Sequence, residues 1–308
     1  MKKICSIVVT YNRKEILLEC IAAILSQTYP VHKLIILDNN STDNTKEYLL
    51  EKGLLERTEI VYERLSTNTG GAGGFYYGMK KASEYEPDWY WIMDDDVIPT
   101  RNCLEELVNA NEIIENKVSF LASSVRGING EPMNVPKILK ESTETYVDWY
   151  QYLDSGIIQI RKATFVSLLI NCQAVKKCGY PWKEFFIWGD DSEYTQRIIR
   201  DFGPAYMVGK SKVVHKRKGG DALSIVKEEN KKRIDMYFYY YRNNLIGYWE
   251  YENVLYRFLC MGKLGYDFVL TLVKGKYKLR KMKVIIKAFF SFVFGMYNKK
   301  SFKNRATL

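Results

Sequence analysis

Three consecutive aspartates, Asp94, Asp95 and Asp96, directly follow an apolar run at 89–93. Carboxylates placed side by side repel one another and resist removal from water, so a strand that ends in three of them favours a nearby cation. Carboxylate oxygens suit Mg²⁺ or Mn²⁺, which keep part of their coordination shell for substrate phosphates. The alternative is a solvated acidic turn or the cap of a following helix, because aspartate is common in both.

A second metal ligand is suggested by His215, one of only two histidines in the chain. Imidazole readily joins carboxylates around Mn²⁺, and the basic residues that follow at 216–218 would suit a phosphate-bearing partner. A structural role at the end of a strand is the alternative.

A glycine-rich segment at 68–75 reads Asn-Thr-Gly-Gly-Ala-Gly-Gly-Phe and leads into a predicted helix. Its backbone N–H groups could meet an anion at the helix N-terminus. No Gly-Lys-Ser/Thr follows, as a Walker loop requires, and Tyr76 stands where a dinucleotide fingerprint needs its third glycine. The alternative is a turn that lets the helix pack closely on a sheet.

Two further polar clusters have residue types suited to binding and proton transfer. Asp38-Asn-Asn at 38–40 could hold a base edge or ribose hydroxyls, or cap the next helix. Either Asp190 or Asp191 could act as a general base beside an aromatic floor, made by Trp182 or Trp188, that could bind the face of a sugar. Acidic residues at a helix start also stabilise its dipole without any catalytic role.

The elements that would position these residues alternate between strand-like and helical runs, which predicts an α/β fold with a mainly parallel sheet. Strands are predicted at 4–9, 34–37, 59–62, 89–93 and 118–122, with helices near 13–26, 43–52, 72–85 and 100–115. Functional groups gather at the carboxyl ends of parallel strands. The clusters at 10–13, 38–40, 68–75 and 94–96 should therefore share one edge of the sheet.

The second half of the chain is less regular. Glycine and proline at 124–162 predict hairpins or an irregular insertion beside the site. Further elements are predicted as a strand at 164–170, a helix at 192–200, short strands at 205–208 and 212–215, and helices from 228 onward.

The composition is that of a globular protein, with 308 residues, 47% hydrophobic and 27% charged. Six cysteines without a CxxC pair favour reduced thiols in the cytosol over disulfides or zinc. The apolar run at 4–9 is too short for a signal peptide, and no stretch approaches the roughly 18 apolar residues that a membrane span needs. We therefore expect a cytoplasmic protein.

The net charge of +10 is concentrated in the C-terminal tail, since eleven Lys/Arg and no Asp/Glu follow residue 270. Within that tail an aromatic segment at 288–297 has lysines on both sides, which suits an interfacial helix on an anionic membrane surface. The alternative is a helix that docks its aromatic residues on the domain. Nucleic-acid binding is not expected, because the rest of the chain has no positive excess.

Taken in order, these motifs resemble the family 2 glycosyltransferases, which are inverting enzymes with the GT-A nucleotide-sugar-binding fold. The resemblance covers about residues 3–250. The glycine segment, the triple aspartate and Trp-Gly-Asp-Asp at 188–191 are most similar to galactofuranosyltransferases and related rhamnosyltransferase-like enzymes. It implies a GT-A domain at 1–250, and the composition of the tail predicts a helical, basic, membrane-associating region at 251–308.

The resemblance also implies roles for individual residues. Asp94 and Asp96, with His215, would hold a Mn²⁺ or Mg²⁺ ion that bridges the donor pyrophosphate. Asp191 would be the general base and Asp190 would support it. Six residues would bind the nucleotide-sugar donor: Thr10, Tyr11, Arg13, Asp38, Asn68 and Asp95.

The function expected from this resemblance is a metal-dependent transferase at the inner face of the cell membrane, acting in cell-surface polysaccharide synthesis. It would move a sugar from a nucleoside diphosphate, with UDP-galactofuranose as the first candidate, to a lipid-linked glycan. Little room for flanking domains favours a single addition over processive polymerisation. The alternatives are a dTDP-rhamnose or UDP-hexopyranose transferase of the same fold, and a catalytically silent membrane-bound scaffold.

Overall fold

The computed structural model describes residues 1–114, 117–140, 148–217 and 223–295. The chain forms two compact units. The first consists of Met1–Lys183 and Tyr194–Lys218, and the second of Glu184–Glu193 and Gly219–Leu308. Each unit has a hydrophobic core of its own. The predicted domain boundary at residue 250 stays a prediction.

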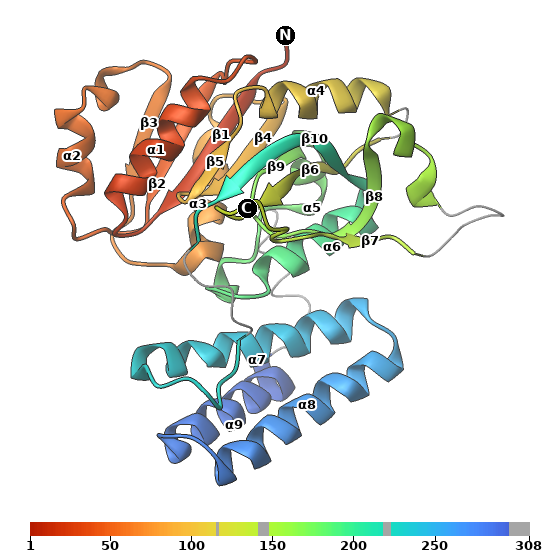
Figure 1. Cartoon of the computed structure of the whole chain (residues 1–308). Helices are drawn as coiled ribbons and strands as arrows, with labels where there is room; N and C mark the ends of the chain where they lie inside the picture. Colours follow the sequence, from red (N-terminus) through yellow and green to blue (C-terminus); the bar gives the residue numbers. More distant parts are fainter. Residues whose placement is uncertain (115–116, 141–147, 218–222, 296–308) are drawn as a thin grey trace. The chain divides into compact units, whose positions relative to one another are not determined.

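The first unit is built on a mixed sheet of ten strands in the order β3-β2-β1-β4-β9-β6-β10-β8-β7, with β5 paired to β10 (Figure 1). The strands are β1 Ile4–Thr10, β2 Lys33–Asp38, β3 Ile60–Arg64, β4 Trp89–Asp94, β5 Val97–Pro99, β6 Phe120–Arg126, β7 Lys137–Ile138, β8 Ile157–Lys162, β9 Leu168–Asn171 and β10 Ala205–His215.

Parallel pairing of β3, β2, β1 and β4 confirms the alternation predicted for the first half. Strands β1, β2 and β4 are mostly apolar and buried on both faces, because helices cover both faces of the sheet, whereas β3 is an edge strand that is only partly buried. Successive side chains point to opposite sides, so Ile4 and Val8 enter one core while Ile7 and Val9 enter the other. Helices α1 Lys14–Leu25, α2 Thr45–Glu51 and α4 Cys103–Ile113 line the first core, and α3 Gly70–Ser83 and α5 Cys172–Cys178 line the second.

Two parts of the sheet differ from the prediction. The strand predicted at 164–170 is β9, which begins only at Leu168 and runs antiparallel between β4 and β6. The two short strands predicted at 205–208 and 212–215 are a single strand, β10, whose register with β6 shifts between Val208 and Lys212. This bulge explains the split, because it interrupts the apolar pattern without ending the strand.

The predicted insertion at 124–162 contains the antiparallel pair β7 and β8. Residues 141–147 of this insertion lie outside the described residues.

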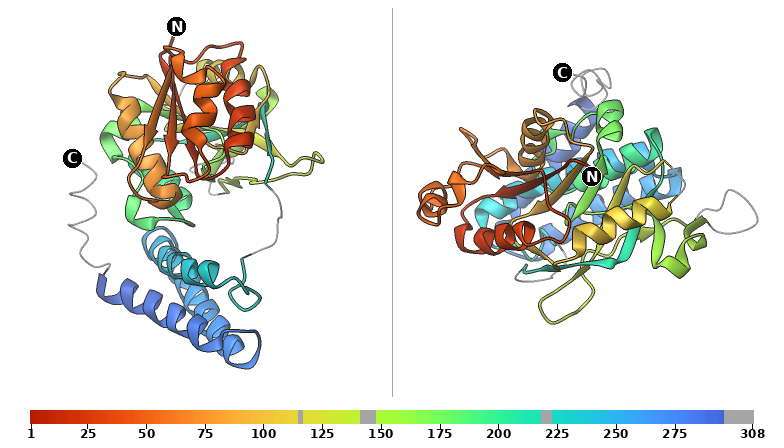
Figure 2. Two further views of the ribbon diagram at one scale, coloured as in Figure 1. Left: turned by 90° about the vertical axis from the view of Figure 1, so that its left-hand side faces the viewer. Right: turned by 90° about the horizontal axis from the view of Figure 1, so that it is seen from above.

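The second unit is helical, as predicted from 228 onward, with α7 Lys231–Tyr251, α8 Val254–Val273 and α9 Lys278–Gly295 (Figure 2). Asn230 and Asn253 cap α7 and α8 by accepting hydrogen bonds from backbone N–H groups of the first turn. Tyr237 and Tyr241 of α7 are buried against α9 side chains such as Ile285. Helix α6, Asp190–Asp201, begins in this unit and continues in the first. A membrane-spanning helix is not found in the described parts of the chain.

Candidate functional site

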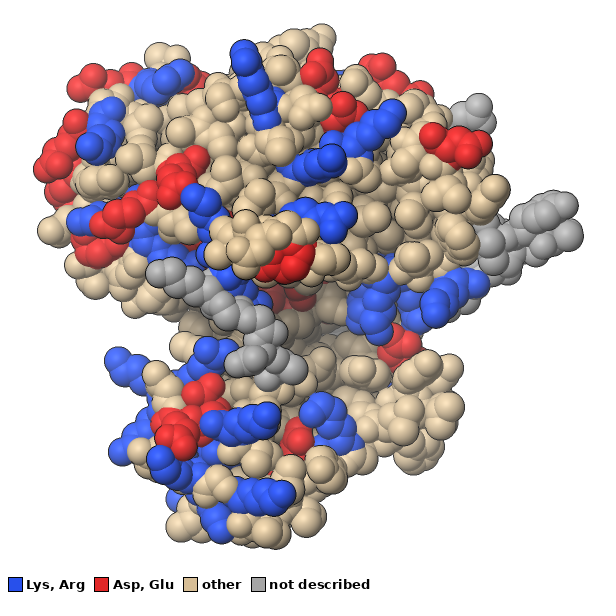
Figure 3. All heavy atoms as spheres, viewed as in Figure 1, with Lys and Arg blue, Asp and Glu red and all other residues tan. Residues whose placement is uncertain are grey.

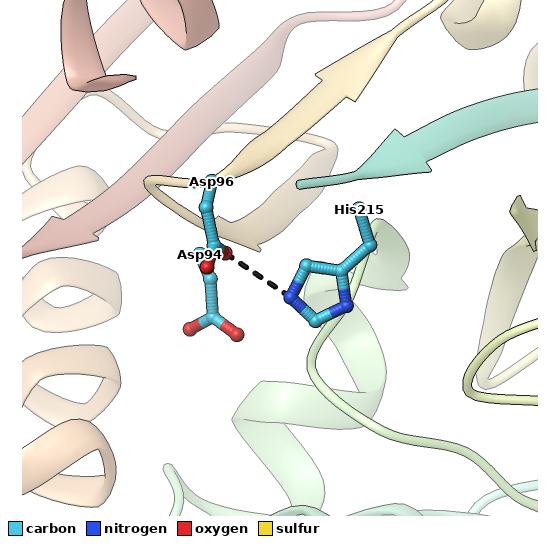
Figure 4. Close-up of side chains that lie close together, drawn as sticks. All are labelled: Asp94, Asp96 and His215. Atoms are coloured by element: carbon cyan, nitrogen blue, oxygen red, sulfur yellow. Dashed lines mark ion pairs between the residues drawn. The ribbon is translucent and has the colours of Figure 1, made fainter. Parts of the chain in front are cut away.

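Asp94, Asp96 and His215 come together in the first unit. Asp94 is the last residue of β4, Asp96 lies in the turn to β5, and His215 is the last residue of β10. Pairing of β5 with β10 places His215 opposite Val97, directly beside that turn. One ligand atom from each of the three residues lies within 4.8 Å of the others, and His215 Nε2 is 3.1 Å from Asp96 Oδ1 (Figure 4).

Asn134 contacts the other nitrogen of the His215 ring. His215 Nδ1 lies 2.9 Å from Asn134 Oδ1, an amide oxygen that can only accept, so Nδ1 carries a proton. Nε2 therefore presents either a second proton or a lone pair to Asp96. In the neutral ring, the lone pair faces the buried Oδ1, which has no hydrogen bond in the structure. A divalent cation would satisfy both atoms, so these residues fit a metal site.

Asn134 was not identified from the sequence, which gave only the irregular insertion around it. Its φ of 49° is in the left-handed region, which asparagine tolerates. The bridge between Arg126 and Pro132, and the 3.2 Å hydrogen bond from Met133 N–H to the Val125 carbonyl, fold this segment back on β6. Because β6 pairs with β10, the fold brings Asn134 to His215.

Arg13 and Thr10 contact carboxylate oxygens of Asp95 and Asp96. Arg13 Nη1 lies 2.8 Å from Asp96 Oδ2 and 3.3 Å from Asp95 Oδ1, and Thr10 Oγ1 donates to Asp95 Oδ2 at 2.7 Å. Burial raises the pKa of Asp95 to about 6, although Thr10 and Arg13 oppose the shift. Burial opposes the ionisation of Asp96, but when His215 is protonated its Nε2–H and its charge, with Arg13, outweigh burial and lower the pKa of Asp96. The carboxylates of this site are therefore close together and partly removed from water, and Arg13 neutralises part of their negative charge.

The carboxyl end of β2 lies beside the carboxyl end of β1. Asp38 pairs with Thr10 in the β1–β2 register and is buried. Its carboxylate accepts hydrogen bonds from Tyr62 Oη and, at 2.7 Å, from the Ser41 backbone N–H. Arg64 Nε lies 3.9 Å away. Asp38 is thus held in place as the base of a turn, and it does not cap the next helix, because α2 begins at Thr45 with Asn44 as its N-cap.

The glycine segment is tied to the same edge through Asn39. Its amide donates to the Gly70 carbonyl and accepts from the Thr69 N–H, both at 2.8 Å. Asn68 Oδ1 accepts from the Gly70 N–H at 2.8 Å. A Cβ on Gly74 would lie 2.4 Å from Val9 Cγ1, so this glycine allows α3 to pack on β1. Close packing therefore accounts for at least one of the glycines.

The four strand-end clusters thus lie along one edge of the first unit, in the arrangement that the parallel sheet predicted. Tyr11 is exposed within its cluster. The roles assigned to the individual residues remain predictions.

In the second unit, a strained loop leads to Asp190 and Asp191. Phe186 and Trp188 both have a φ of 61°, an unusual conformation for bulky side chains. The buried Asn243 side chain stabilises this loop, since its Nδ2 lies 2.9, 3.2 and 2.9 Å from the carbonyl oxygens of Phe185, Ile187 and Trp188.

The aspartate pair at the start of α6 is electrostatically asymmetric. Burial, and next the charge of Asp191, raise the pKa of Asp190. The negative charge of the pair therefore resides mainly on Asp191, which is only partly buried. When the surroundings of two neighbouring carboxyl groups make their pKa values differ in this way, one group commonly serves as an acid and the other as a base.

The two tryptophans predicted to contact an acceptor have other neighbours in the structure. In the first unit, the Arg197 guanidinium lies 4.9 Å from the centroid of the Trp182 ring. In the second unit, Trp188 packs against Tyr237, with ring centroids 5.3 Å apart. Their role in acceptor binding stays a prediction.

Comparison with known proteins identifies the family. The sequence model described as "Glycosyl transferase family 2" matches residues 5–171, more than half of the chain. The chain belongs to glycosyl transferase family 2. The matched range contains Asp94 to Asp96 and ends before Asp191 and His215, so the assignment of those two residues depends on other observations.

Two curated relatives within the family cover similar lengths. Galactofuranosyltransferase GlfT1 of Mycolicibacterium smegmatis is 34% identical over 203 residues, which are 64% of this chain and 65% of that protein. Poly(ribitol-phosphate) beta-N-acetylglucosaminyltransferase TarP of Staphylococcus aureus is 30% identical over 207 residues, 65% of this chain and 58% of that protein. The chain therefore matches less than two thirds of either relative.

Among solved structures, GalNAc-T7 with UDP, GalNAc and Mn²⁺ superposes with a TM-score of 0.60 at 14% identity, covering 98% of this chain and 58% of that one. At this identity the similarity concerns the fold alone. The fold is GT-A, as the sequence predicted, with a central sheet flanked by helices.

Proposed function

We propose that this family 2 member is an inverting glycosyltransferase that moves a sugar from a nucleoside diphosphate to a lipid-linked glycan. The observation that carries the proposal is the cluster of Asp94, Asp96 and His215 at the strand-end edge, beside the polar groups of 10–13 and 38–40. Similarity to GlfT1 supports UDP-galactofuranose as the first candidate donor and cell-surface polysaccharide as the product.

Within this proposal, Asp94, Asp96 and His215 hold a Mn²⁺ or Mg²⁺ ion. When bound, such an ion supplies positive charge that stabilises the departing nucleoside diphosphate. Asp38 and Asn68 orient the nucleotide, together with Thr10, Tyr11, Arg13 and Asp95. Arg13 lies beside the carboxylates of Asp95 and Asp96, so its guanidinium would also lie next to a pyrophosphate bound at these residues.

We assign Asp191 as the general base that removes the proton from the acceptor hydroxyl as that oxygen attacks the anomeric carbon. Asp190 supports this role, because its raised pKa keeps it protonated and leaves the charge on Asp191. Attack opposite the leaving group inverts the anomeric configuration. Trp182 and Trp188 are the candidates for contact with the acceptor sugar.

We also propose that the protein works at the inner face of the cell membrane, where a lipid-linked acceptor is found. The aromatic part of the tail supports both of its earlier interpretations: Ala288 and Phe292 are buried in the second unit, while Phe290 and Phe294 are 50% and 79% exposed. Residues 296–297 of that segment lie outside the described residues.

A screen of nucleotide-sugars with Mn²⁺ tests the donor. We expect turnover of UDP-galactofuranose, and no turnover after Asp96→Ala or His215→Ala. Similarity to TarP makes a UDP-hexopyranose the second candidate. A preference for such a donor, or for dTDP-rhamnose, would overturn the assignment of UDP-galactofuranose. Metal dependence that is unchanged in both variants would show that Asp96 and His215 do not bind the metal. If the original protein turned over none of the donors, the alternative of a catalytically silent scaffold would be favoured.

Replacement of Asp191 by Asn tests the base. Positioned bases contribute about 10²–10⁴-fold to rate, so we expect a loss of that order in kcat. Binding of UDP and Mn²⁺ should be unchanged, because the proposed ligands of both are elsewhere. Near-normal turnover of the variant would exclude Asp191 as the base.

A further inference from the structure

Helix α8 exposes its most apolar face. Eight large apolar or aromatic side chains recur along this face at the three- and four-residue spacing of a helix, and each is at least 46% exposed. They are Val254, Leu255, Phe258, Leu259, Tyr266, Val269, Leu272 and Val273. Gly262 and Gly265 lie between them, and no charged residue interrupts the face. We call this set of residues the α8 stripe.

The opposite face of α8 is the one that packs within the second unit. Leu264 and Phe268 contact its hydrophobic core. Asp267 accepts a hydrogen bond from Tyr241 Oη at 2.8 Å and contacts Lys263 Nζ at 3.0 Å. A helix of a water-soluble domain normally buries its apolar face and exposes its charges. In α8 the most apolar face is outside, which is typical of a surface that docks on something else.

The charges around the stripe identify what it docks on. Nine Lys/Arg lie between Val254 and Gly295, against a single acidic residue, Asp267, which is engaged on the inner face. Figure 3 shows basic side chains beside wide uncharged areas on the visible surface of these helices. A second copy of this chain would bring like charges together, whereas anionic lipid headgroups would attract them.

We propose that α8 lies in the interface of an anionic lipid bilayer, parallel to its plane, with the α8 stripe inserted among the acyl chains. Twenty residues give a helix about 30 Å long, enough for several apolar turns to enter together. The proposal rests on the proposed function in one respect, that a lipid-linked acceptor requires a membrane. It assigns the main contact to α8 rather than to the aromatic segment at 288–297.

Vesicle flotation of the full-length protein tests this proposal. We expect binding to phosphatidylcholine vesicles that contain phosphatidylglycerol, and much weaker binding to phosphatidylcholine alone. The variant Leu255→Ser/Phe258→Ser should bind about tenfold more weakly or worse, because two inserted side chains are lost. The matched control is Leu50→Ser/Ile113→Ser, which changes two exposed apolar residues of the first unit and should bind normally.

A second measurement locates the contact directly. The chain has six tryptophans of its own, so quenching by brominated lipids in the anionic vesicles is compared with that of the original protein. The indole introduced by Phe258→Trp should add to the quenching, and that introduced by Leu50→Trp should not. Transfer to a soluble acceptor analogue should be the same in the stripe variant and the original protein, because the stripe contains none of the residues assigned to the reaction. Failure of the membrane proposal is therefore distinguishable from failure of the transferase proposal.

Three results would overturn the assignment. The first is unchanged flotation of the stripe variant with normal melting, and the second is no quenching of the indole introduced by Phe258→Trp. The third is a dimer in sedimentation that the stripe substitutions convert to a monomer, with no vesicle binding by the original protein. That last result would identify a second copy as the partner of α8.

Discussion

Both nitrogens of the His215 ring have a neighbour, and the neighbour of Nδ1 determines whether Nε2 can bind a metal. Asn134 Oδ1 accepts a hydrogen bond from the Nδ1–H at 2.9 Å, while Nε2 faces Asp96 at 3.1 Å. Metal-binding histidines usually have such a partner, which selects the tautomer and orients the ring. Asn134 is therefore a positioning residue for the proposed metal site.

We predict that Asn134→Gly lowers the affinity for Mn²⁺ by about 10–100-fold, the usual effect of removing such a partner. Glycine accepts the φ of 49° without strain, so the loss would come from the side chain rather than the backbone. Titration calorimetry with Mn²⁺ alone, without donor, measures the effect. Asn134→Asp keeps an acceptor and should restore affinity. Equal affinities for the original and glycine proteins would show that Asn134 does not orient His215.

Sequence reasoning found the carboxylates and the histidine but not Asn134, for a physical reason. Three acids at the end of an apolar run form a local signal, because their mutual repulsion is evident from the residues themselves. Asn134 is 81 positions from His215 and has an uncharged side chain. Only the pairing of β6 with β10 and the fold-back of 127–134 bring the two together.

At the level of elements, the loop at 184–189 depends on α7. The side chain of Asn243 spans three carbonyl oxygens of this loop and also accepts from Arg242, whose Nη2 donates to the Glu184 carbonyl. These bonds offset the cost of left-handed φ values at two aromatic residues. This role of Asn243 was not predicted from the sequence, because hydrogen bonds to backbone carbonyls leave no periodic pattern.

We predict that Asn243→Ala reduces kcat strongly and destabilises the protein by about 1–3 kcal/mol, the cost of leaving buried polar groups unpaired. Mn²⁺ affinity should not change, since the proposed ligands belong to the first unit. Asn244→Ala is the matched control, because its amide donates to the Tyr240 carbonyl of the same helix. Activity and melting of the two variants would be compared. Similar losses in both would show that general weakening of α7, not the loop, is responsible.

The start of α6 gives a prediction for pH. Burial, and then the charge of Asp191, raise the pKa of Asp190 from 3.8 to about 8. Between these values the folded protein retains a proton that the unfolded chain has lost, so the free energy of unfolding falls as pH rises through this window and levels off above it. Asp190→Asn does not titrate. Its stability relative to the original protein should therefore rise by about 1 kcal/mol or more between low and high pH within this window.

Chemical denaturation at several pH values within that window measures this difference. Asp235→Asn is the control, because Arg280 lowers the pKa of Asp235 below the same window. That variant should run parallel to the original protein. A constant difference between Asp190→Asn and the original protein would mean that Asp190 is ionised throughout.

The elements themselves were predictable to different degrees. Strands β1, β2 and β4 are runs of large apolar residues buried on both faces, so the sequence alone indicates them. The three-residue β5 has no such signature, and β9 was predicted as a strand but not as an antiparallel one, because the places of both are set by neighbours distant in the chain. The mixed part of the sheet, which brings His215 to the aspartates, therefore became evident only from the structure.

At the scale of the whole molecule, the residues assigned to the reaction belong to two units. The proposed metal ligands belong to the first unit, while Asp191 belongs to the second, together with α7 to α9. The segment 184–193 leaves the first unit and the chain then returns to it through α6. The family and its fold were predictable from motifs in order, but this division depends on tertiary contacts such as those of Asn243.

The division predicts the behaviour of a shortened chain that ends at Arg217. Such a chain keeps both hydrophobic cores of the first unit and all three proposed metal ligands, so we expect it to bind Mn²⁺ and UDP. It lacks Asn243 and the rest of α7, so the loop before Asp191 loses its support and transfer should fall to the level of full-length Asp191→Asn. Calorimetry and a transfer assay on both proteins make the comparison. Transfer by the shortened chain at the normal rate would show that α7 to α9, including Asn243, are not needed to position Asp191.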